Sequence, residues 1–196
     1  MKIFPVMALV WALLIGAPAA QAQQPLSIKP IAERKVTELP AGELFWRIEN
    51  VPTLQAAKDA AGTFGLAAEA AGKVWLFTLG ARGGSSGAGT KVTEVGPIPR
   101  VKAEQYLLRI NEATGPNGAI TSVHSHPGSE AFYVLAGEQN IKSAHGTMKV
   151  TPGKAEAGHG ADMAMQVSST GATDLHALVM FVVDANRPFS SPAKFP

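Results

Sequence analysis

Short runs of apolar residues, bounded by glycine or proline, recur along the chain from residue 74 onward. Most alternate apolar and polar positions or are rich in β-branched and aromatic residues, and both patterns favour strands. The last run is apolar at consecutive positions, as expected of a strand buried on both faces. The pattern predicts an all-β sandwich or barrel, with strands at residues 74–79, 91–95, 105–110, 120–125, 130–135, 139–144, 147–150, 163–168 and 175–183.

The first part of the chain is less regular. Residues 23–40 are polar with scattered prolines, and they predict an extended arm with one edge strand around residues 26–28. A second short strand is expected at residues 44–48. One helix is predicted over residues 54–61, because this alanine-rich segment follows Thr53, a typical N-cap residue, and ends before a glycine.

The glycine-rich segment from Gly80 to Gly89 has the glycine spacing of a phosphate-binding loop. However, Thr90 and Lys91 follow in the reverse of the order that this motif needs, and the next residues favour a strand. No helix N-terminus would then face a phosphate. The segment is therefore interpreted as a mobile hairpin loop and not as a nucleotide site.

The N-terminus has the pattern of a secretory signal peptide. Met1 and Lys2 precede an apolar run that ends at Gly16, and Ala20-Gln21-Ala22 supplies a small-x-small cleavage signal. The apolar core is shorter than the roughly 20 residues of a membrane span, so a cleaved signal is favoured over an anchor. We expect cleavage near Ala22 and a periplasmic or secreted protein.

The composition excludes several classes of function. Seventeen Lys and Arg residues nearly balance fifteen Asp and Glu residues, and no basic tract is present. We therefore expect no nucleic-acid partner, and no membrane partner after signal cleavage. The chain contains no cysteine, which excludes disulfides, cysteine-rich zinc sites and thiol nucleophiles. Any metal must be bound by His, Asp, Glu or weaker ligands.

The candidate chemistry is concentrated in residues 118–137. His124 and His126 are separated by one residue, so on a strand both imidazoles project from the same face. The turn residues Pro127 to Ser129 allow Glu130 to open the next strand beside them. Two imidazoles and one carboxylate are the donor set of many non-haem iron sites. His124, His126 and Glu130 are therefore the predicted metal ligands.

This segment resembles the first signature of the cupin superfamily, G-x5-H-x-H-x3-E-x6-G. The matching positions, with every spacing kept, are Gly118, His124, His126, Glu130 and Gly137. The resemblance covers roughly residues 105–183. It implies a jelly-roll β-barrel in which the two histidines and the glutamate bind a metal, with an N-terminal extension of extra strands and one short helix around the barrel.

The N-terminal pattern and the resemblance together predict a layout of the whole chain. We expect a signal peptide over residues 1–22, an arm with the helix and extra strands over 23–100, the barrel over 101–187, and a tail over 188–196 that packs along the surface. Cupins often form homodimers through sheet edges, so a homodimer is a further option.

The second cupin signature, G-x5-P-x-G-x2-H-x3-N, is incomplete. With Gly153 as its first glycine, its metal-binding histidine falls on Ala164, and a shift of one residue puts Met163 or Met165 there. The two methionines are expected to share a face in the barrel interior and to make the cavity apolar. The candidates for a replacement fourth ligand are His159 and His176.

Two functions stay open at this point. A divalent transition metal at the predicted site (iron or manganese, with zinc or nickel as alternatives) would suit a dioxygenase-like oxidoreductase, or an isomerase or lyase that uses a Lewis acid. Its substrate would be a small organic molecule. The alternative is a non-catalytic protein that binds a small molecule or a sugar, with a structural metal or none. The fold does not choose between them.

Overall fold

The computed structural model describes residues 24–196, which form fourteen strands and one short helix. The predicted all-β fold is confirmed. The predicted signal peptide lies outside the described residues. Within residues 24–196, no helix is both long and apolar enough to cross a membrane.

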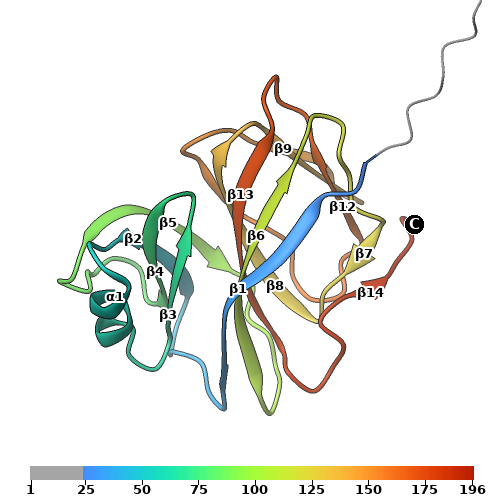
Figure 1. Ribbon diagram of the computed structural model, residues 1–196. Coiled ribbons are helices and arrows are strands. Elements are labelled where there is room, and N and C mark those ends of the chain that lie inside the picture. Colours follow the sequence, from blue (N-terminus) through green and yellow to red (C-terminus); the bar gives the residue numbers. More distant parts are fainter. Residues whose placement is uncertain (1–23) are drawn as a thin grey trace, which may run out of the picture.

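Two five-stranded antiparallel sheets face each other and form a jelly roll (Figure 1). The chain changes sheet at nearly every connection from β6 to β13, and only β9 and β10 are consecutive strands of one sheet. The first sheet has the order β1 (Ser27–Val36), β6 (Tyr106–Gly115), β13 (Leu175–Asp184), β8 (Gly128–Ala136) and β11 (Ala155–Ala157). The second has the order β10 (Gly146–Val150), β9 (Gln139–Ser143), β12 (Met165–Ser169), β7 (His124–Ser125) and β14 (Ser191–Pro192).

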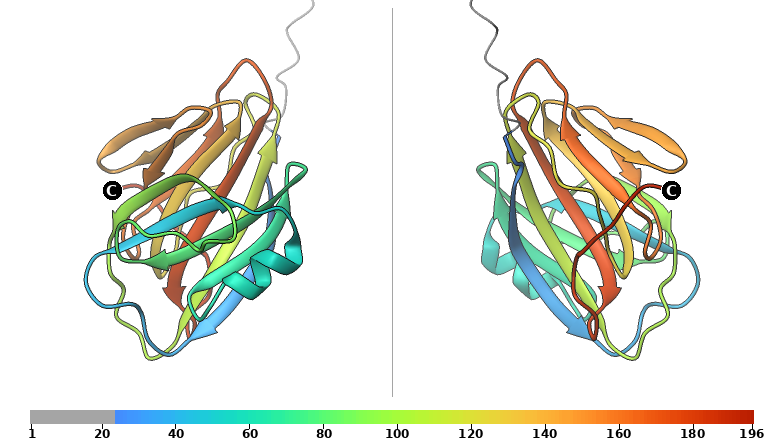
Figure 2. Two further views of the ribbon diagram at one scale, coloured as in Figure 1. Left: turned by 90° about the vertical axis from the view of Figure 1, so that its left-hand side faces the viewer. Right: turned by 90° about the vertical axis from the view of Figure 1, so that its right-hand side faces the viewer.

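A third, four-stranded sheet packs on the outer face of the first sheet, and the helix α1 (Leu54–Ala60) covers its far side (Figures 1 and 2). The molecule therefore has four layers, with the first sheet as an inner one. The order of the third sheet is β3 (Gly65–Ala70), β4 (Lys73–Gly80), β2 (Leu44–Asn50) and β5 (Thr90–Ile98).

Strand β13 lies in the middle of this arrangement and is hydrogen-bonded to β6 and β8. Val179 and Phe181 belong to the apolar cluster inside the jelly roll, whereas Met180 and Val182 pack against the third sheet. This confirms the prediction of a strand buried on both faces. Each such side chain contributes about 1.5–3 kcal/mol through burial, so this strand anchors two cores at once.

The predicted helix is confirmed at residues 54–60. The side-chain oxygen of Thr53 accepts a hydrogen bond from the backbone N–H of Ala56, at 3.2 Å, and so caps the first turn. Ala57 and Ala61 are buried against Leu76 of β4. Small side chains on this face let the helix lie close to the sheet.

Several details differ from the sequence predictions, including the strands β3 and β11, which were not predicted. The expected arm contains a ten-residue strand, β1, at the edge of the first sheet. Residues 120–125 form only the two-residue β7 and two isolated bridges at Ile120, to Pro25 and to Ser168, because this segment runs along the cavity described below. The tail does not merely pack along the surface, since β14 adds a strand to the second sheet.

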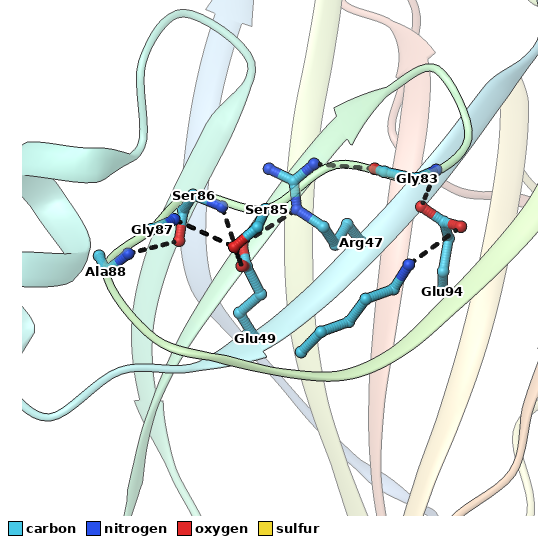
Figure 3. Close-up of polar contacts among 9 residues, drawn as sticks. Arg47, Glu49, Gly83, Ser85, Ser86, Gly87, Ala88 and Glu94 are labelled. Carbon is cyan, nitrogen blue, oxygen red and sulfur yellow. Dashed lines mark hydrogen bonds and ion pairs between the residues drawn. The ribbon is translucent and has the colours of Figure 1, made fainter.

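The glycine-rich segment is not a hairpin loop. Strands β4 and β5 lie on opposite sides of β2, so residues 81–89 cross over that strand. Glu49 of β2 is fully buried beneath the crossing and holds it in place (Figure 3). Its carboxylate accepts hydrogen bonds from the backbone N–H of Ser86 at 3.0 Å, the Ser85 hydroxyl at 3.3 Å and Arg47 Nε at 3.0 Å. The interpretation as a mobile hairpin is therefore replaced by an anchored crossover.

Candidate functional site

A cavity of about 390 Å³ lies between the two sheets of the jelly roll. The three predicted ligands, His124, His126 and Glu130, all line it. Three elements bring them together, namely β7, the turn that follows it and the start of β8. The other lining residues considered below are Arg109, Asn111, Phe132, Gln139, Phe181 and Phe189.

A signature glycine has a clear physical role at the far end of β8. Gly137 has a φ of +70°, and a Cβ at this position would lie 2.6 Å from the backbone oxygen of Asp174. Only glycine therefore allows the chain to turn here from β8 towards β9, close to the loop that enters β13. This connection carries the chain from one sheet of the cavity to the other.

The two histidines are held so that the same ring nitrogen of each remains free. His124 Nδ1 lies 2.8 Å from the backbone oxygen of Ser122, and His126 Nδ1 lies 2.7 Å from that of Phe189. A carbonyl can only accept a hydrogen bond, so each neutral ring carries its proton on Nδ1 and keeps the lone pair on Nε2. The ring centroids are 5.1 Å apart. This is the tautomer that metal-binding histidines adopt.

Burial keeps His126 neutral. Desolvation is the main cause that lowers its pKa from 6.5 to about 4, and the charges of His124 and Arg109 add to this effect. The hydrogen bond to Phe189 acts in the opposite direction and is outweighed. His126 is therefore available as a neutral donor across the whole physiological pH range.

Glu130 is almost completely buried, and its Oε1 has no hydrogen-bond partner within the described residues. Desolvation raises the pKa of this carboxyl to about 8, so without a nearby cation it is protonated at neutral pH. Gly158 covers it closely, because a Cβ there would lie 2.6 Å from Glu130 Cγ. A divalent cation is the kind of partner that would reverse the pKa shift.

Arg109 lies on the same cross-strand row as Glu130. In the register of the first sheet, Arg109 of β6 pairs with Phe181 of β13, and Phe181 pairs with Glu130 of β8. Two strand spacings separate the backbones of Arg109 and Glu130 by about 10 Å. The guanidinium is 3.9 Å from the ring centroid of Phe189 and forms an ion pair with Glu33 at 2.5 Å. It is thus a fixed positive group at the rim of the cavity.

The C-terminal tail forms part of the site, which the sequence did not predict. Ser191 and Pro192 pair with β7, and the backbone N–H of Ala193 donates to Val123 at 3.1 Å. This pairing places Phe189 so that its oxygen accepts the proton of His126 Nδ1 and its ring packs against His126 and Phe181. The only sequence signal for this role of the tail was that an aromatic residue, Phe189, lies within a proline-rich segment.

Met165, one of the residues near the expected fourth-ligand slot of the second signature, does not supply a ligand to the cavity. This residue is paired with His124 in the sheet and is buried in the interior cluster. Neither Met163 nor Met165 lines the cavity, whose apolar wall is instead formed by aromatic and valine side chains. The expectation of a methionine-lined cavity is therefore corrected.

Neither of the two replacement ligands lies at the cavity. His159 is outside the lining, and its ring centroid is 6.1 Å from that of the exposed His145. His176 is on the opposite face of β13, where its Nε2 lies 2.7 Å from a carboxylate oxygen of Glu112. Side chains alternate along a strand, and Leu175 and Ala177 occupy the inner face, so His176 points outward.

Within residues 24–196, no three His, Asp or Glu side chains are placed close enough to hold a metal ion as they stand. The three predicted ligands share the cavity without forming a closed triad. The ring centroids of the two histidines are 5.1 Å apart, and Glu130 lines the same cavity.

Comparisons with known proteins give a limited result. No family model matches the sequence, and no curated protein matches it. Among solved structures, a cupin-like protein from Thermotoga maritima is 13% identical with a TM-score of 0.40, over 45% of this chain and 65% of that one. The DMSP lyase DddQ from Ruegeria pomeroyi is 22% identical with a TM-score of 0.38, over 44% and 43%.

The polyketide cyclase RemF from Streptomyces resistomycificus is 22% identical with a TM-score of 0.36, over 45% of this chain and 62% of that one. The chain spans less than two thirds of each of these three proteins. At these TM-scores the likenesses carry no argument about the site. The complete first signature on β7 and β8 and the two-sheet jelly roll around it agree with each other. On these two grounds the chain resembles the cupin superfamily in its signature and in its jelly-roll fold.

Proposed function

We propose that this protein binds a divalent transition metal through His124, His126 and Glu130 and acts on a small organic molecule in the cavity. The observation that carries the proposal is the state of the two histidines. Both Nδ1 atoms are bonded to backbone oxygens, which leaves both Nε2 lone pairs available beside a buried carboxylate without a partner.

The donor set fits a metal in charge as well as in type. Two neutral imidazoles and one carboxylate would give the site a net charge of +1 with a divalent ion, which a buried cavity tolerates better than an isolated carboxylate. The proposal requires that Glu130 loses its proton and changes its side-chain conformation when the metal enters. Iron and manganese suit this nitrogen and oxygen donor set, and zinc or nickel are alternatives.

We favour an enzyme over a purely binding role because three protein ligands leave coordination positions free. When bound, the metal would supply a Lewis acid or a site for oxygen chemistry. The residues of the chain would orient the substrate and exclude water: Phe132 and Phe181 line the wall, and Phe189 covers His126. The second candidate, a non-catalytic small-molecule-binding cupin, is favoured because the described residues contain no preformed cluster of three metal ligands.

Metal analysis tests the proposal. Wild-type protein purified without chelators should contain close to one transition metal ion per chain, and the His126→Ala variant should contain almost none. The matched control is His145→Ala, because His145 is exposed and lies outside the cavity. Equal metal content in wild type and His126→Ala would rule the site out.

A second experiment separates the enzyme from the binding protein. Protein loaded with iron or manganese would be assayed for oxygen uptake and for conversion of a panel of small phenols and diketones. Turnover that is lost in Glu130→Gln supports the enzyme. Binding of panel members without turnover supports the alternative.

Export is also a proposal. The sequence of residues 1–22 supports cleavage near Ala22 and a periplasmic or secreted protein. N-terminal sequencing of protein recovered from the periplasm or the medium should begin near Gln23. An intact Met1 in that fraction would contradict it.

A further inference from the structure

The cavity contains buried polar atoms that the proposed metal site does not use. Asn111 is 2% exposed and Gln139 is 0% exposed, and both line the cavity. The Oδ1 of Asn111 and both terminal atoms of Gln139 have no hydrogen-bond partner within the described residues. Buried amides are nearly always hydrogen-bonded, because leaving them without a partner costs free energy. A cluster of such groups on one cavity therefore indicates a ligand.

Both residues lie deeper in the cavity than the histidines. Asn111 pairs with Val179, and Val179 pairs with Phe132. This row is two residues further along the sheet than the row of Arg109, Phe181 and Glu130, which corresponds to about 7 Å. Asn111 thus faces the middle of the cavity, one layer beyond the proposed metal site.

Gln139 lies at the far end, on the second sheet. Met165 is opposite His124 and Ser143, whereas Ser169, four residues later on β12, is opposite Gln139. Four residues span about 13 Å along a strand. The hydroxyl of Ser169 also lacks a partner within residues 24–196. The lining remote from the histidines therefore carries unpartnered amide groups, with Asn111 on the row of Val179 and Phe132 and Gln139 further from the histidines.

We propose that Asn111 and Gln139 form a second polar subsite that binds a neutral hydroxyl or carboxamide group at the distal end of an elongated substrate. The other end of this substrate would reach His124, His126 and Glu130, so the inference rests in part on the proposed function. The rest of the substrate would be apolar and would contact Phe132, Val167 and Val179, which line the same cavity.

The chemistry of the amides defines the group that they bind. An amide offers both a donor and an acceptor, so it is matched by a hydroxyl or a carboxamide, which also offer both. A carboxylate or phosphate would need a cation at this end. Among the lining residues that the structure describes, the only Lys or Arg is Arg109, which is on the row of Glu130 and is paired with Glu33.

Two hydroxamates test the proposal. Benzohydroxamic acid and 4-hydroxybenzohydroxamic acid carry the same metal-binding group, and only the second has a hydroxyl at the distal end of the ring. Their affinities for protein loaded with Mn²⁺ would be measured by calorimetry. In wild type the hydroxylated compound should bind at least about tenfold more tightly, which is 1.4 kcal/mol. The ratio should fall to about one in Gln139→Met and in Asn111→Leu.

A second measurement does not depend on the metal. Gln139→Met keeps the length of the side chain and removes its polar atoms without partners, so the melting temperature of the ligand-free protein should rise by a few degrees. The matched control is Gln166→Met, because the Nε2 of Gln166 donates to the backbone oxygen of Thr121 at 3.1 Å. That change should lower the melting temperature or leave it unchanged.

The outcomes separate the two proposals. Equal affinities of the two hydroxamates for the wild type overturn the polar subsite and leave the metal site in place. If neither compound binds and Mn²⁺ is not retained, the metal site fails. In that case the polar subsite is supported if Gln139→Met raises the melting temperature, and it is contradicted if Gln139→Met lowers the melting temperature.

Discussion

Two carboxylates are buried in the part of the chain that the structure describes, and they are in opposite states. Glu49 of the third sheet is completely buried, and its oxygens accept hydrogen bonds from Ser85, Ser86 and Arg47 (Figure 3). Glu130 of the jelly roll is almost as buried, and its Oε1 has no partner within the described residues. Glu49 is fully hydrogen-bonded, whereas Glu130 is not.

Their pKa values shift in opposite directions for this reason. Burial alone would raise the pKa of Glu49, but the bonds from Ser86 and Arg47 outweigh it and hold this pKa below its ordinary value of 4.5. Burial of Glu130 has no such compensation and raises its pKa to about 8. The comparison indicates a distinction between two kinds of buried carboxylate. One with hydrogen-bond partners stabilises the fold, whereas one without partners that lines a cavity is available to bind a ligand.

The largest expected effect is on metal affinity. Glu130→Gln removes a proposed charged ligand, so affinity for Mn²⁺ should fall by roughly a thousandfold, more than the 10–100-fold typical of residues that only orient a ligand. Titration calorimetry with Mn²⁺ would measure it. Glu49→Gln is the matched control and should leave the affinity unchanged. If Glu130→Gln binds Mn²⁺ as tightly as wild type, Glu130 is not a metal ligand, and the two carboxylates do not differ in function.

The next largest effect is on stability. Glu49→Gln should destabilise the protein by about 3 kcal/mol, because it leaves Arg47 without its buried partner. For a chain of this size that corresponds to a fall in melting temperature of roughly 6–12 °C. Glu69→Gln in β3 is the control, since Glu69 is exposed in the same sheet. A fall of less than about 2 °C for Glu49→Gln would show that the crossover does not depend on this network.

The tail should matter for metal binding in a smaller way. Deletion of residues 189–196 removes the oxygen that fixes the tautomer of His126 and the ring that packs on it. Affinity for Mn²⁺ should fall by about 10–100-fold. A shorter deletion of residues 194–196 leaves both contacts and is the control. Equal affinities in the two truncated proteins would show that Phe189 does not position His126.

A further prediction concerns the pH dependence of stability in the metal-free protein. Between pH 4.5 and about 8 the folded state keeps a proton on Glu130 that the unfolded state has lost, so stability falls as pH rises through this window. Glu130→Gln removes this pH-dependent loss. Its free energy of unfolding, relative to that of wild type, should therefore increase from pH 5 to pH 8. Denaturant unfolding at several pH values would show it.

Glu49 should behave in the opposite way. Its stabilisation is fully present above pH 4.5 and is lost as pH falls through its lowered folded pKa. The difference in free energy of unfolding between wild type and Glu49→Gln should therefore become smaller at acid pH. A deficit that is constant with pH would indicate that Glu49 acts through packing and not through charge.

The parts of the molecule that the sequence predicted are those with a local cause. The alternating runs specify strands through their own side chains, and the spacing of His124, His126 and Glu130 brings all three to one cavity once β7 and β8 form. The consecutive apolar residues of β13 require burial on both faces. None of these features depends on distant segments.

The features that the sequence did not predict depend on contacts between segments that are far apart in the chain. In β6, Leu108 and Ile110 look like the inward face by pattern, and Arg109 and Asn111 like the solvent face. The third sheet covers the face of Leu108 and Ile110, so the polar face lines the cavity instead. The tail was missed for the same reason, since the role of Phe189 exists only once β14 pairs with β7.

Anomalous diffraction from crystals grown with Mn²⁺ tests the central claim most directly. We predict one strong peak in the cavity, at coordination distance from Nε2 of His124, Nε2 of His126 and a carboxylate oxygen of Glu130. The Glu130 side chain should be rotated towards the histidines. A cavity without a peak, or a peak that Glu130 does not contact, would contradict the account.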